Sequence, residues 1–212
     1  MIGLLQNKYA AAHGSTRIPA VRHEVCNDAD FCIMDKKAHI VCASLDDGVG
    51  VYDNNSKRYG ITIIDFEKFV NEFKPSTAAG RGKKCDFILY DNQEAYVILN
   101  ELSELDAKYL EGHEVYGENK EGKRSHAIRQ IQESIDKLVV SSDIRSYMDR
   151  KARRIGLFSY RINEDDSIPK EIQQSMTKFG MVKNSFSNVS APIFSNGFVF
   201  EQRIYPTPFK LE

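Results

Sequence analysis

Tryptophan is absent from this chain of 212 residues, and proline and cysteine are scarce, with six and four residues. No apolar run approaches the roughly 18 residues of a membrane span, so we expect no membrane-spanning helix. Charge of one sign is not in excess, because 29 Lys and Arg residues face 30 Asp and Glu residues, for a net charge of −1. This balance excludes a globally basic nucleic-acid-binding protein but leaves room for local basic patches.

An export signal and internal repeats are missing too. The first residues turn polar before a signal-peptide core can form, so we expect a cytoplasmic protein whose cysteines are reduced thiols. No low-complexity segment is present. What is present is the ordinary balance of a folded soluble protein, with 42% apolar and 28% charged residues. The length suits one domain of ordinary size with appended pieces.

Apolar runs separated by turn residues predict an α/β (α+β) fold with a mixed central sheet flanked by helices. The strands are expected at about 61–64, 85–90, 95–100 and 155–162. The flanking helices are expected near 65–73, where Asp65 can cap the first turn, and near 125–138, where Ala127, Ile131, Ile135 and Leu138 share one face.

The rest of the chain divides around this core of residues 61–162. An N-terminal β-rich extension at 1–60 includes a hairpin with its turn at 35–38, and a C-terminal extension at 163–212 packs on the core. No linker is long enough to separate two domains, so we expect a single structural domain.

Two acidic residues stand where the central hairpin would bring them together. Asp86 opens one strand, and Glu101 closes the adjacent one. In an antiparallel pair the start of one strand lies beside the end of the other, so both carboxylates should lie at one end of the sheet. Carboxylate oxygens are ligands that Mg²⁺ prefers, and the backbone carbonyl of Leu102 offers a third ligand. A Mg²⁺ site of this kind can activate water and stabilise charge on a phosphate.

This arrangement resembles the PD-(D/E)xK superfamily of restriction-endonuclease-like nucleases, over roughly residues 65–162. Cys85-Asp86 stands where the family has Pro-Asp, and Glu101-Leu102-Ser103 stands where it has Glu-x-Lys. The order of strands and helices also matches the family core. The resemblance implies a restriction-endonuclease-like core and Mg²⁺-dependent hydrolysis of DNA phosphodiester bonds, with Asp86 and Glu101 as the catalytic and metal-binding carboxylates.

The motif departs from the family at the lysine, which there orients and activates the attacking water. Ser103 occupies that position and offers only a neutral hydroxyl. Either a basic residue reaches in from elsewhere, or the site is inactive. The candidates for a replacement are Lys83, Lys84 and Lys123, and Gln130 is a candidate for positioning water.

Basic residues cluster at three places that suit contacts with nucleic-acid phosphates. The residues expected to bind are Arg81, Lys83 and Lys84 before Asp86, Lys123 and Arg124 at the start of a helix, and Arg153 and Arg154 in the densest cluster. The alternative is that these are solvated side chains at helix ends, where cations complement the helix dipole.

A second set of residues offers soft ligands for zinc. The set is His23, Cys26, Cys32, His39 and Cys42. Zinc binds four such ligands, often in close pairs. However, positions three apart on a strand face opposite sides, and Cys32 and Cys42 can be explained as small apolar strand residues. Zinc binding therefore stays open.

The C-terminal segment is rich in phenylalanine. Six of the twelve phenylalanines lie there, namely Phe179, Phe186, Phe194, Phe198, Phe200 and Phe209. Aromatic residues on loops and edge strands are typical anchors for a protein partner. The alternative is that they cover one face of the sheet.

Three functional hypotheses follow from these observations. The first is a degenerate nuclease-like protein, serving as an accessory subunit of a nucleic-acid-processing or antiviral defence complex. The second is an active Mg²⁺-dependent deoxyribonuclease. The third is an α/β interaction domain of unrelated fold. Ser103 favours the first hypothesis, and the basic run before Asp86 favours contact with DNA.

Overall fold

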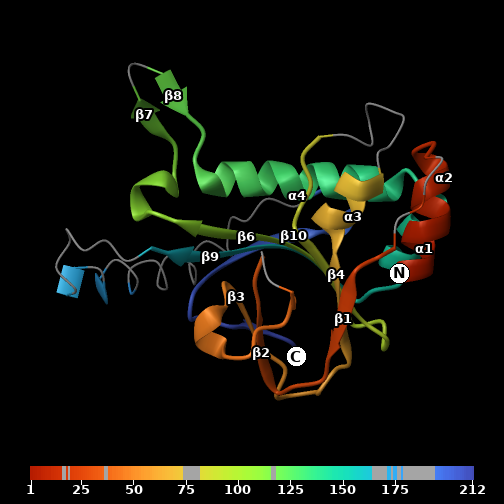
Figure 1. The fold of residues 1–212 in the computed structure, drawn as a ribbon, viewed down its shortest axis with the longest axis horizontal. Helices are drawn as coiled ribbons and strands as arrows, with labels where there is room; N and C mark the ends of the chain where they lie inside the picture. Colours follow the sequence, from red (N-terminus) through yellow and green to blue (C-terminus); the bar gives the residue numbers. More distant parts are fainter. Residues whose placement is uncertain are drawn as a thin grey trace.

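The computed structural model describes residues 1–15, 18, 20–35, 38–73, 82–115, 118–163, 171–172, 174–175, 178 and 194–212. Its centre is a six-stranded mixed sheet with the strand order β1-β4-β5-β6-β9-β10 (Figure 1). These strands are β1 (His23–Cys26), β4 (Ile61–Asp65), β5 (Phe87–Asp91), β6 (Tyr96–Leu105), β9 (Arg153–Ile162) and β10 (Val199–Ile204). The four strands predicted for the core are the middle four of this sheet, which confirms the predicted mixed sheet.

The type of strand pairing changes once across the sheet. Pairing is antiparallel from β1 through β4 and β5 to β6, and parallel from β6 through β9 to β10. A parallel pair needs a crossover, and the chain between β6 and β9 contains helix α4 (Lys123–Val139) and helix α5 (Ser142–Asp149). The buried face of α4 includes Ala127, Ile131, Ile135 and Leu138, as the sequence predicts.

The remaining elements cover the two faces and the ends of the sheet. A three-stranded sheet has the order β11 (Phe209–Lys210), β3 (Gly50–Asp53) and β2 (Asp30–Ile33), and β7 (His113–Val115) pairs with β8 (Glu118–Lys120). The helices are α1 (Ile2–Leu4), η1 (Leu5–Tyr9), α2 (Ala10–Ala12), α3 (Phe66–Phe73) and the short turns η2 (Leu45–Asp47), η4 (Ala107–Tyr109) and η6 (Ser195–Gly197).

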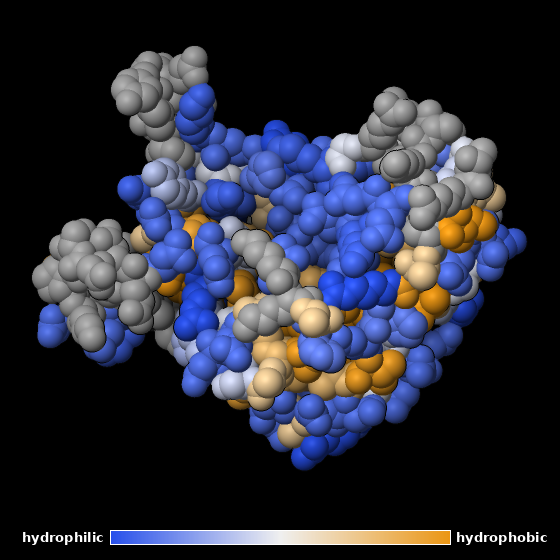
Figure 2. Space-filling view, viewed as in Figure 1, coloured by the Kyte–Doolittle hydropathy of each residue, from blue (hydrophilic) through white to orange (hydrophobic). Residues whose placement is uncertain are grey.

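Two hydrophobic cores lie on opposite faces of the large sheet. Side chains alternate along a strand, so Val97 and Leu99 of β6 pack in the core under α4, whereas Tyr96 and Ile98 pack in the core that includes Tyr52 of β3. Figure 1 accordingly shows α4 along one face and the β2–β3 sheet against the other. The exposed surface over α4 is hydrophilic (Figure 2).

The described phenylalanines of the C-terminal segment are buried. Phe194, Phe198, Phe200 and Phe209 are at most 6% exposed, while Phe179 and Phe186 lie outside the described residues. Gly156 on β9 makes room for this packing, because a Cβ there would lie 2.5 Å from Cε2 of Phe194. Burial in the isolated chain favours the sheet-covering alternative for these four rings.

Other expectations differ in detail. The expected hairpin of residues 31–43 is reduced to one bridge between Ile33 and Val41, because β2 forms its ladder with β3 instead. Strand β6 continues beyond residue 100 to Leu105, since it pairs with β9 over its whole length. In the described part of the chain, no helix is long and apolar enough to cross a membrane.

Candidate metal centre

Asp86 and Glu101 meet across the β5–β6 hairpin. The β5–β6 ladder pairs Phe87 with Asn100, so one step further places Asp86 opposite Glu101. Both carboxyl groups lie on the α4 face, because the alternate residues Ile88 and Leu99 pack in the core under α4. Oδ2 of Asp86 accepts a hydrogen bond from the backbone N–H of Leu102 at 2.7 Å. The two side chains are each 9% exposed.

The turn of this hairpin explains why its register is fixed. Asp91 ends β5, and its carboxylate accepts hydrogen bonds from the backbone N–H groups of Gln93, Ala95 and Tyr96 at 2.6, 3.2 and 2.5 Å. An aspartate that bonds to the backbone ahead of it stabilises a turn. Since a one-residue slip would turn every side chain to the other face, this turn also fixes the face that Asp86 and Glu101 share.

Helix α4 holds the backbone that leads into Asp86. One face of the helix contacts three consecutive residues of this segment. Lys83 is held at both of its backbone groups: Oε2 of Glu133 accepts from its N–H at 3.0 Å, and Nζ of Lys137 donates to its carbonyl. Nε2 of Gln130 donates to the carbonyl of Lys84 at 2.9 Å. Oγ of Ser134 accepts from the N–H of Cys85 at 2.8 Å. These side chains recur at helical spacing, so one rigid element sets the position of Asp86.

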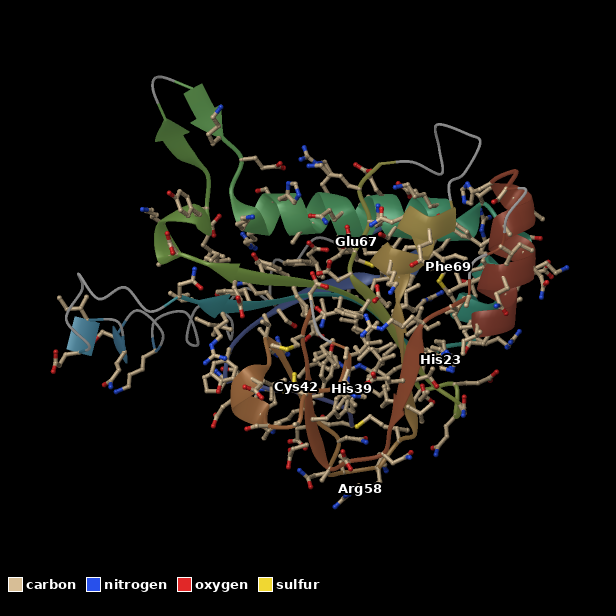
Figure 3. The ribbon with its side chains drawn as sticks, viewed as in Figure 1. His23, His39, Cys42, Arg58, Glu67 and Phe69 are labelled. Atoms are coloured by element: carbon tan, nitrogen blue, oxygen red, sulfur yellow. The ribbon has the colours of Figure 1, made fainter. Side chains whose placement is uncertain are left out.

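Helix α3 places a third carboxylate, that of Glu67, beside Asp86. The helix begins directly after β4, and its first backbone N–H groups, those of Phe66 and Glu67, donate to the carbonyl of Asp86 at 2.9 and 3.1 Å. Asp65 caps the helix by accepting from the N–H of Lys68 at 3.0 Å. The first turn of α3 therefore rests on the backbone of Asp86, and Glu67 projects from that turn (Figure 3).

A fourth carboxylate, that of Asp35, comes from the segment after β2. We call residues 34–41 the Asp35 arm; residues 34–35 and 38–41 of it are described. The carboxylate of Glu24 on β1 accepts from the N–H groups of Ile40 and Val41 at 3.0 and 2.9 Å. Arg22 donates to the carbonyl of Ala38 at 2.8 Å. The end of the arm that is remote from Asp35 is thus hydrogen-bonded to β1 and to the residue that precedes it.

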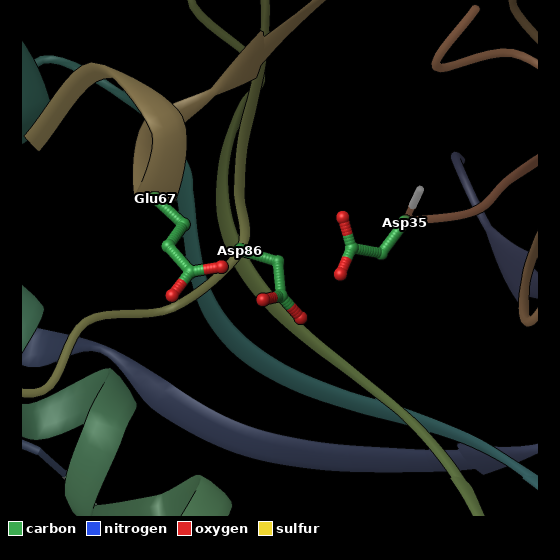
Figure 4. A group of neighbouring side chains, drawn as sticks. All are labelled: Asp35, Glu67 and Asp86. Atoms are coloured by element: carbon green, nitrogen blue, oxygen red, sulfur yellow. The ribbon is translucent and has the colours of Figure 1, made fainter. Parts of the chain in front are cut away.

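Asp35, Glu67 and Asp86 form a compact acidic group (Figure 4). One carboxylate oxygen from each lies within 4.8 Å of the others. Asp86 is buried at the centre, Glu67 is half-buried, and Asp35 is exposed. Asp35 and Glu67 are not among the ligands predicted from the sequence. The acidic residue in the first turn of a predicted helix was a weak signal for Glu67, whereas Asp35 lay in an expected turn, where acidic residues are common.

Burial and mutual repulsion govern the protonation of this group. Burial raises the pKa of Asp86 above the usual carboxyl range, the hydrogen bond from Leu102 lowers it, and the charges of Asp35 and Glu67 raise it further. Burial also raises the pKa of Glu101, and the charge of Asp86 adds to that rise. The ionised carboxylates are therefore costly in the folded chain unless a cation joins them.

Two of the three lysines considered for the missing position, Lys83 and Lys84, have other partners. Ser103 is half-buried on β6. Nζ of Lys83 lies 3.0 Å from Nδ1 of His126, and Nζ of Lys84 donates to Oδ1 of Asn71 at 2.5 Å. Lys123 is exposed at the start of α4. The amide of Gln130 lies beside Glu101, where it lowers the pKa of that carboxyl group.

Most of the basic residues expected to bind nucleic acid contact protein groups. Nε of Arg124 donates to Gln202 at 3.1 Å, an N–H of Arg153 donates to the Tyr96 hydroxyl at 3.1 Å, and an N–H of Arg154 donates to Asp149 at 2.6 Å. Arg81 lies outside the described residues. These three guanidinium groups therefore contact protein atoms, and Lys123 is an exposed candidate for phosphate contact.

The five expected zinc ligands do not form one cluster. Cys32 and Cys42 lie close to each other, but in the described part of the chain the acidic group is the one set of three or more residues with ligand atoms close enough for a metal. Figure 3 shows His23 on β1 apart from His39 and Cys42, which follow β2. Nδ1 of His39 lies 3.4 Å from Glu24, and Sγ of Cys32 donates to the carbonyl of Ser44 at 3.2 Å.

Comparison of the chain with protein-family models, with curated proteins and with solved structures gives no match.

Proposed function

We propose that this chain is a nuclease-like protein with a restriction-endonuclease-like core, whose Asp86–Glu101 site binds a divalent cation. We propose further that it cleaves DNA weakly or not at all by itself. It would act as an accessory subunit of a nucleic-acid-processing or antiviral defence complex. The observation that carries the proposal is the pairing of two buried carboxyl groups across the β5–β6 hairpin, under a helix that crosses to a parallel strand.

The order of the strands supports the proposed core. An antiparallel run from β4 through β5 to β6 is followed by α4 and then by β9, parallel to β6. This is the order on which the resemblance to the family rests. Fold alone does not imply activity, so the function depends on the residues at the start of β5.

The chemistry of the carboxyl groups supports the cation. Asp86 and Glu101 are nearly buried, and Oε2 of Glu101 has no hydrogen-bond partner among the described residues. Buried charges in proteins are paired or coordinate metals. A divalent ion with oxygen ligands, such as Mg²⁺, would satisfy these atoms and could polarise a phosphate oxygen.

Ser103 is the reason to propose weak cleavage or none. A water that attacks a phosphodiester must be oriented and partly deprotonated, and groups that do this typically contribute about 10²- to 10⁴-fold in rate. Lys83 and Lys84 direct their ammonium groups to His126 and Asn71. The described site therefore offers carboxylates for a cation but no cationic group for the water.

The Ser103→Lys variant tests this proposal. Wild type and variant are incubated with linear and supercoiled DNA in Mg²⁺ or Mn²⁺, and the fraction cleaved is measured. We expect cleavage near background for wild type and at least tenfold more for the variant, because a lysine at this position restores the positive charge beside Glu101.

The control is Asp86→Asn combined with Ser103→Lys, which should be as inactive as wild type. Robust cleavage by wild type would contradict the proposal that the nuclease site is degenerate. It would favour a second candidate, an active Mg²⁺-dependent deoxyribonuclease, which is supported by the two further carboxylates of Asp35 and Glu67. If neither protein cleaves DNA and neither binds a cation, the results would favour an α/β interaction domain of a fold unrelated to the nucleases.

A further inference from the structure

We propose that Asp35 and Glu67 are cation ligands, and that they form with Asp86 a three-carboxylate site for a divalent metal, beside the buried carboxyl group of Glu101. This inference rests on the proposed function and extends it to two residues that lie outside the Asp86–Glu101 motif. Both come from elements inserted around the hairpin: Glu67 from α3, between β4 and β5, and Asp35 from the arm that follows β2.

The spacing of the oxygens fits a metal site. One oxygen from each of Asp35, Glu67 and Asp86 lies within 4.8 Å of the others. Two oxygens on opposite sides of one ion are separated by about 4.8 Å for Ca²⁺ and about 4.2 Å for Mg²⁺, given metal–oxygen distances of about 2.4 and 2.1 Å. Oxygens within 4.8 Å of one another are therefore close enough to be shared by one ion of either kind.

Glu101 gives an independent indication of a ligand. This side chain is 9% exposed, and its Oε2 has no hydrogen-bond partner among the described residues. It projects on the same face of the hairpin as Asp86, in the next position of the β5–β6 register. A buried carboxylate oxygen without a donor is costly, and a cation shared with Asp86 would satisfy it.

Two other buried aspartates of this chain each have a cationic side chain as a partner, and the described residues provide none for the acidic group. Asp91, at the opposite end of β5, lies 3.7 Å from Nζ of Lys151, and Asp65 lies 2.8 Å from Arg22. Within the described residues, neither Asp35 nor Glu67 forms an ion pair. The fold therefore supplies an internal cation for Asp65 and for Asp91, and leaves the group of Asp35, Glu67 and Asp86 to a cation from solution.

The two added ligands are held by a common network. Arg22 donates to Asp65, which caps the helix of Glu67, and also to the carbonyl of Ala38 in the Asp35 arm. One guanidinium thus links the two elements that carry Glu67 and Asp35. Because Asp35 is exposed while Asp86 and Glu101 are buried, the arm lies on the side from which an ion can enter.

The test is direct binding of Mn²⁺ and Ca²⁺ to the full chain by isothermal titration calorimetry, after treatment with a chelator. Glu67→Gln and Asp35→Asn should each weaken binding at least tenfold, and Asp86→Asn should abolish it. Glu72→Gln is the matched control on α3, since Glu72 lies 3.9 Å from Lys68 on the exposed side, and it should bind as wild type does. Far-UV circular dichroism verifies that each variant is folded.

The outcomes separate this inference from the proposed function. If Asp86→Asn abolishes binding while Glu67→Gln and Asp35→Asn leave it unchanged, Asp35 and Glu67 are not ligands, and the Asp86–Glu101 site stands. If wild type binds neither cation at millimolar concentration, both proposals are wrong. Loss in only one of the two variants removes the other residue from the site.

Discussion

The protonation of Glu101 affects the stability of the fold, so this residue allows the site to be tested without a substrate. Its neighbours are acidic, it is 9% exposed, and burial raises its pKa. A carboxyl group whose pKa is raised by folding stabilises the protein only while it is protonated. Its contribution is complete below the pKa of the unfolded chain, about 4.3, and is lost as the pH rises toward the raised value in the folded chain.

We therefore expect Glu101→Gln to stabilise the metal-free protein at pH 8 by about 2 kcal/mol, since the neutral amide removes the cost of burying charge. At pH 4 the variant should gain little, because Glu101 is protonated in both states. The measurement is urea unfolding at both pH values in the presence of a chelator.

Glu104→Gln is the control for this measurement, because Glu104 is exposed on the same strand and its substitution should change the free energy of unfolding little at either pH. An equal loss of stability at pH 4 and pH 8 for Glu101→Gln would show that the carboxyl group serves packing rather than a cation.

At the scale of elements, α4 organises the site without supplying a carboxylate ligand. Its side chains contact the backbone of Lys83, Lys84 and Cys85, which immediately precede Asp86. The apolar face of the helix is enough to predict it from the sequence. Its polar contacts depend on which side chains meet a segment some fifty residues away in the chain, and helical periodicity does not specify that.

Among the α4 side chains that contact this segment, Ser134 can be tested by the smallest change, because Ser134→Ala removes only its hydroxyl group. It is fully buried, accepts from the N–H of Cys85 at 2.8 Å and donates to the carbonyl of Gln130 at 2.8 Å. Ser134→Ala leaves the Cys85 N–H unpaired, so we expect a loss of about 1–3 kcal/mol in the free energy of unfolding. Cation affinity should fall with it, although every carboxylate is intact, because Asp86 is less firmly held.

Urea unfolding and calorimetry on the same samples measure both effects. Ser125→Ala, at an exposed position of α4, is the matched control and should change neither. Full stability and full affinity in Ser134→Ala would mean that the contact between α4 and Cys85 does not position the site.

At the scale of the whole molecule, the sequence was sufficient for the centre of the sheet. The strands around Ile88 and Leu99 are continuous apolar runs, and the turn at Asp91 fixes their register, so local information placed Asp86 beside Glu101. Asp35 and Glu67 could not be found in this way. Their positions depend on long-range hydrogen bonds, such as that from Arg22 to Ala38, which leave no spacing pattern in the sequence.

The elements that meet at the site come from distant parts of the chain, so a bound cation should stabilise the whole fold rather than one loop. A ligand at 100 times its Kd that binds only the folded state stabilises it by about 2.7 kcal/mol. In a domain of this size that corresponds to roughly 5–11 °C in Tm. We expect Mn²⁺ to raise the Tm by this order, and to raise it more at pH 8 than at pH 5.

The pH dependence follows because protons and the cation compete for the same oxygens, and the raised pKa of Asp86 and of Glu101 keeps both groups protonated in acid. Thermal unfolding followed by circular dichroism measures the shift, with Asp86→Asn as the control that should show none. A shift of equal size in Asp86→Asn would place the cation elsewhere. A larger shift at pH 5 than at pH 8 would show that carboxylates with raised pKa are not its ligands.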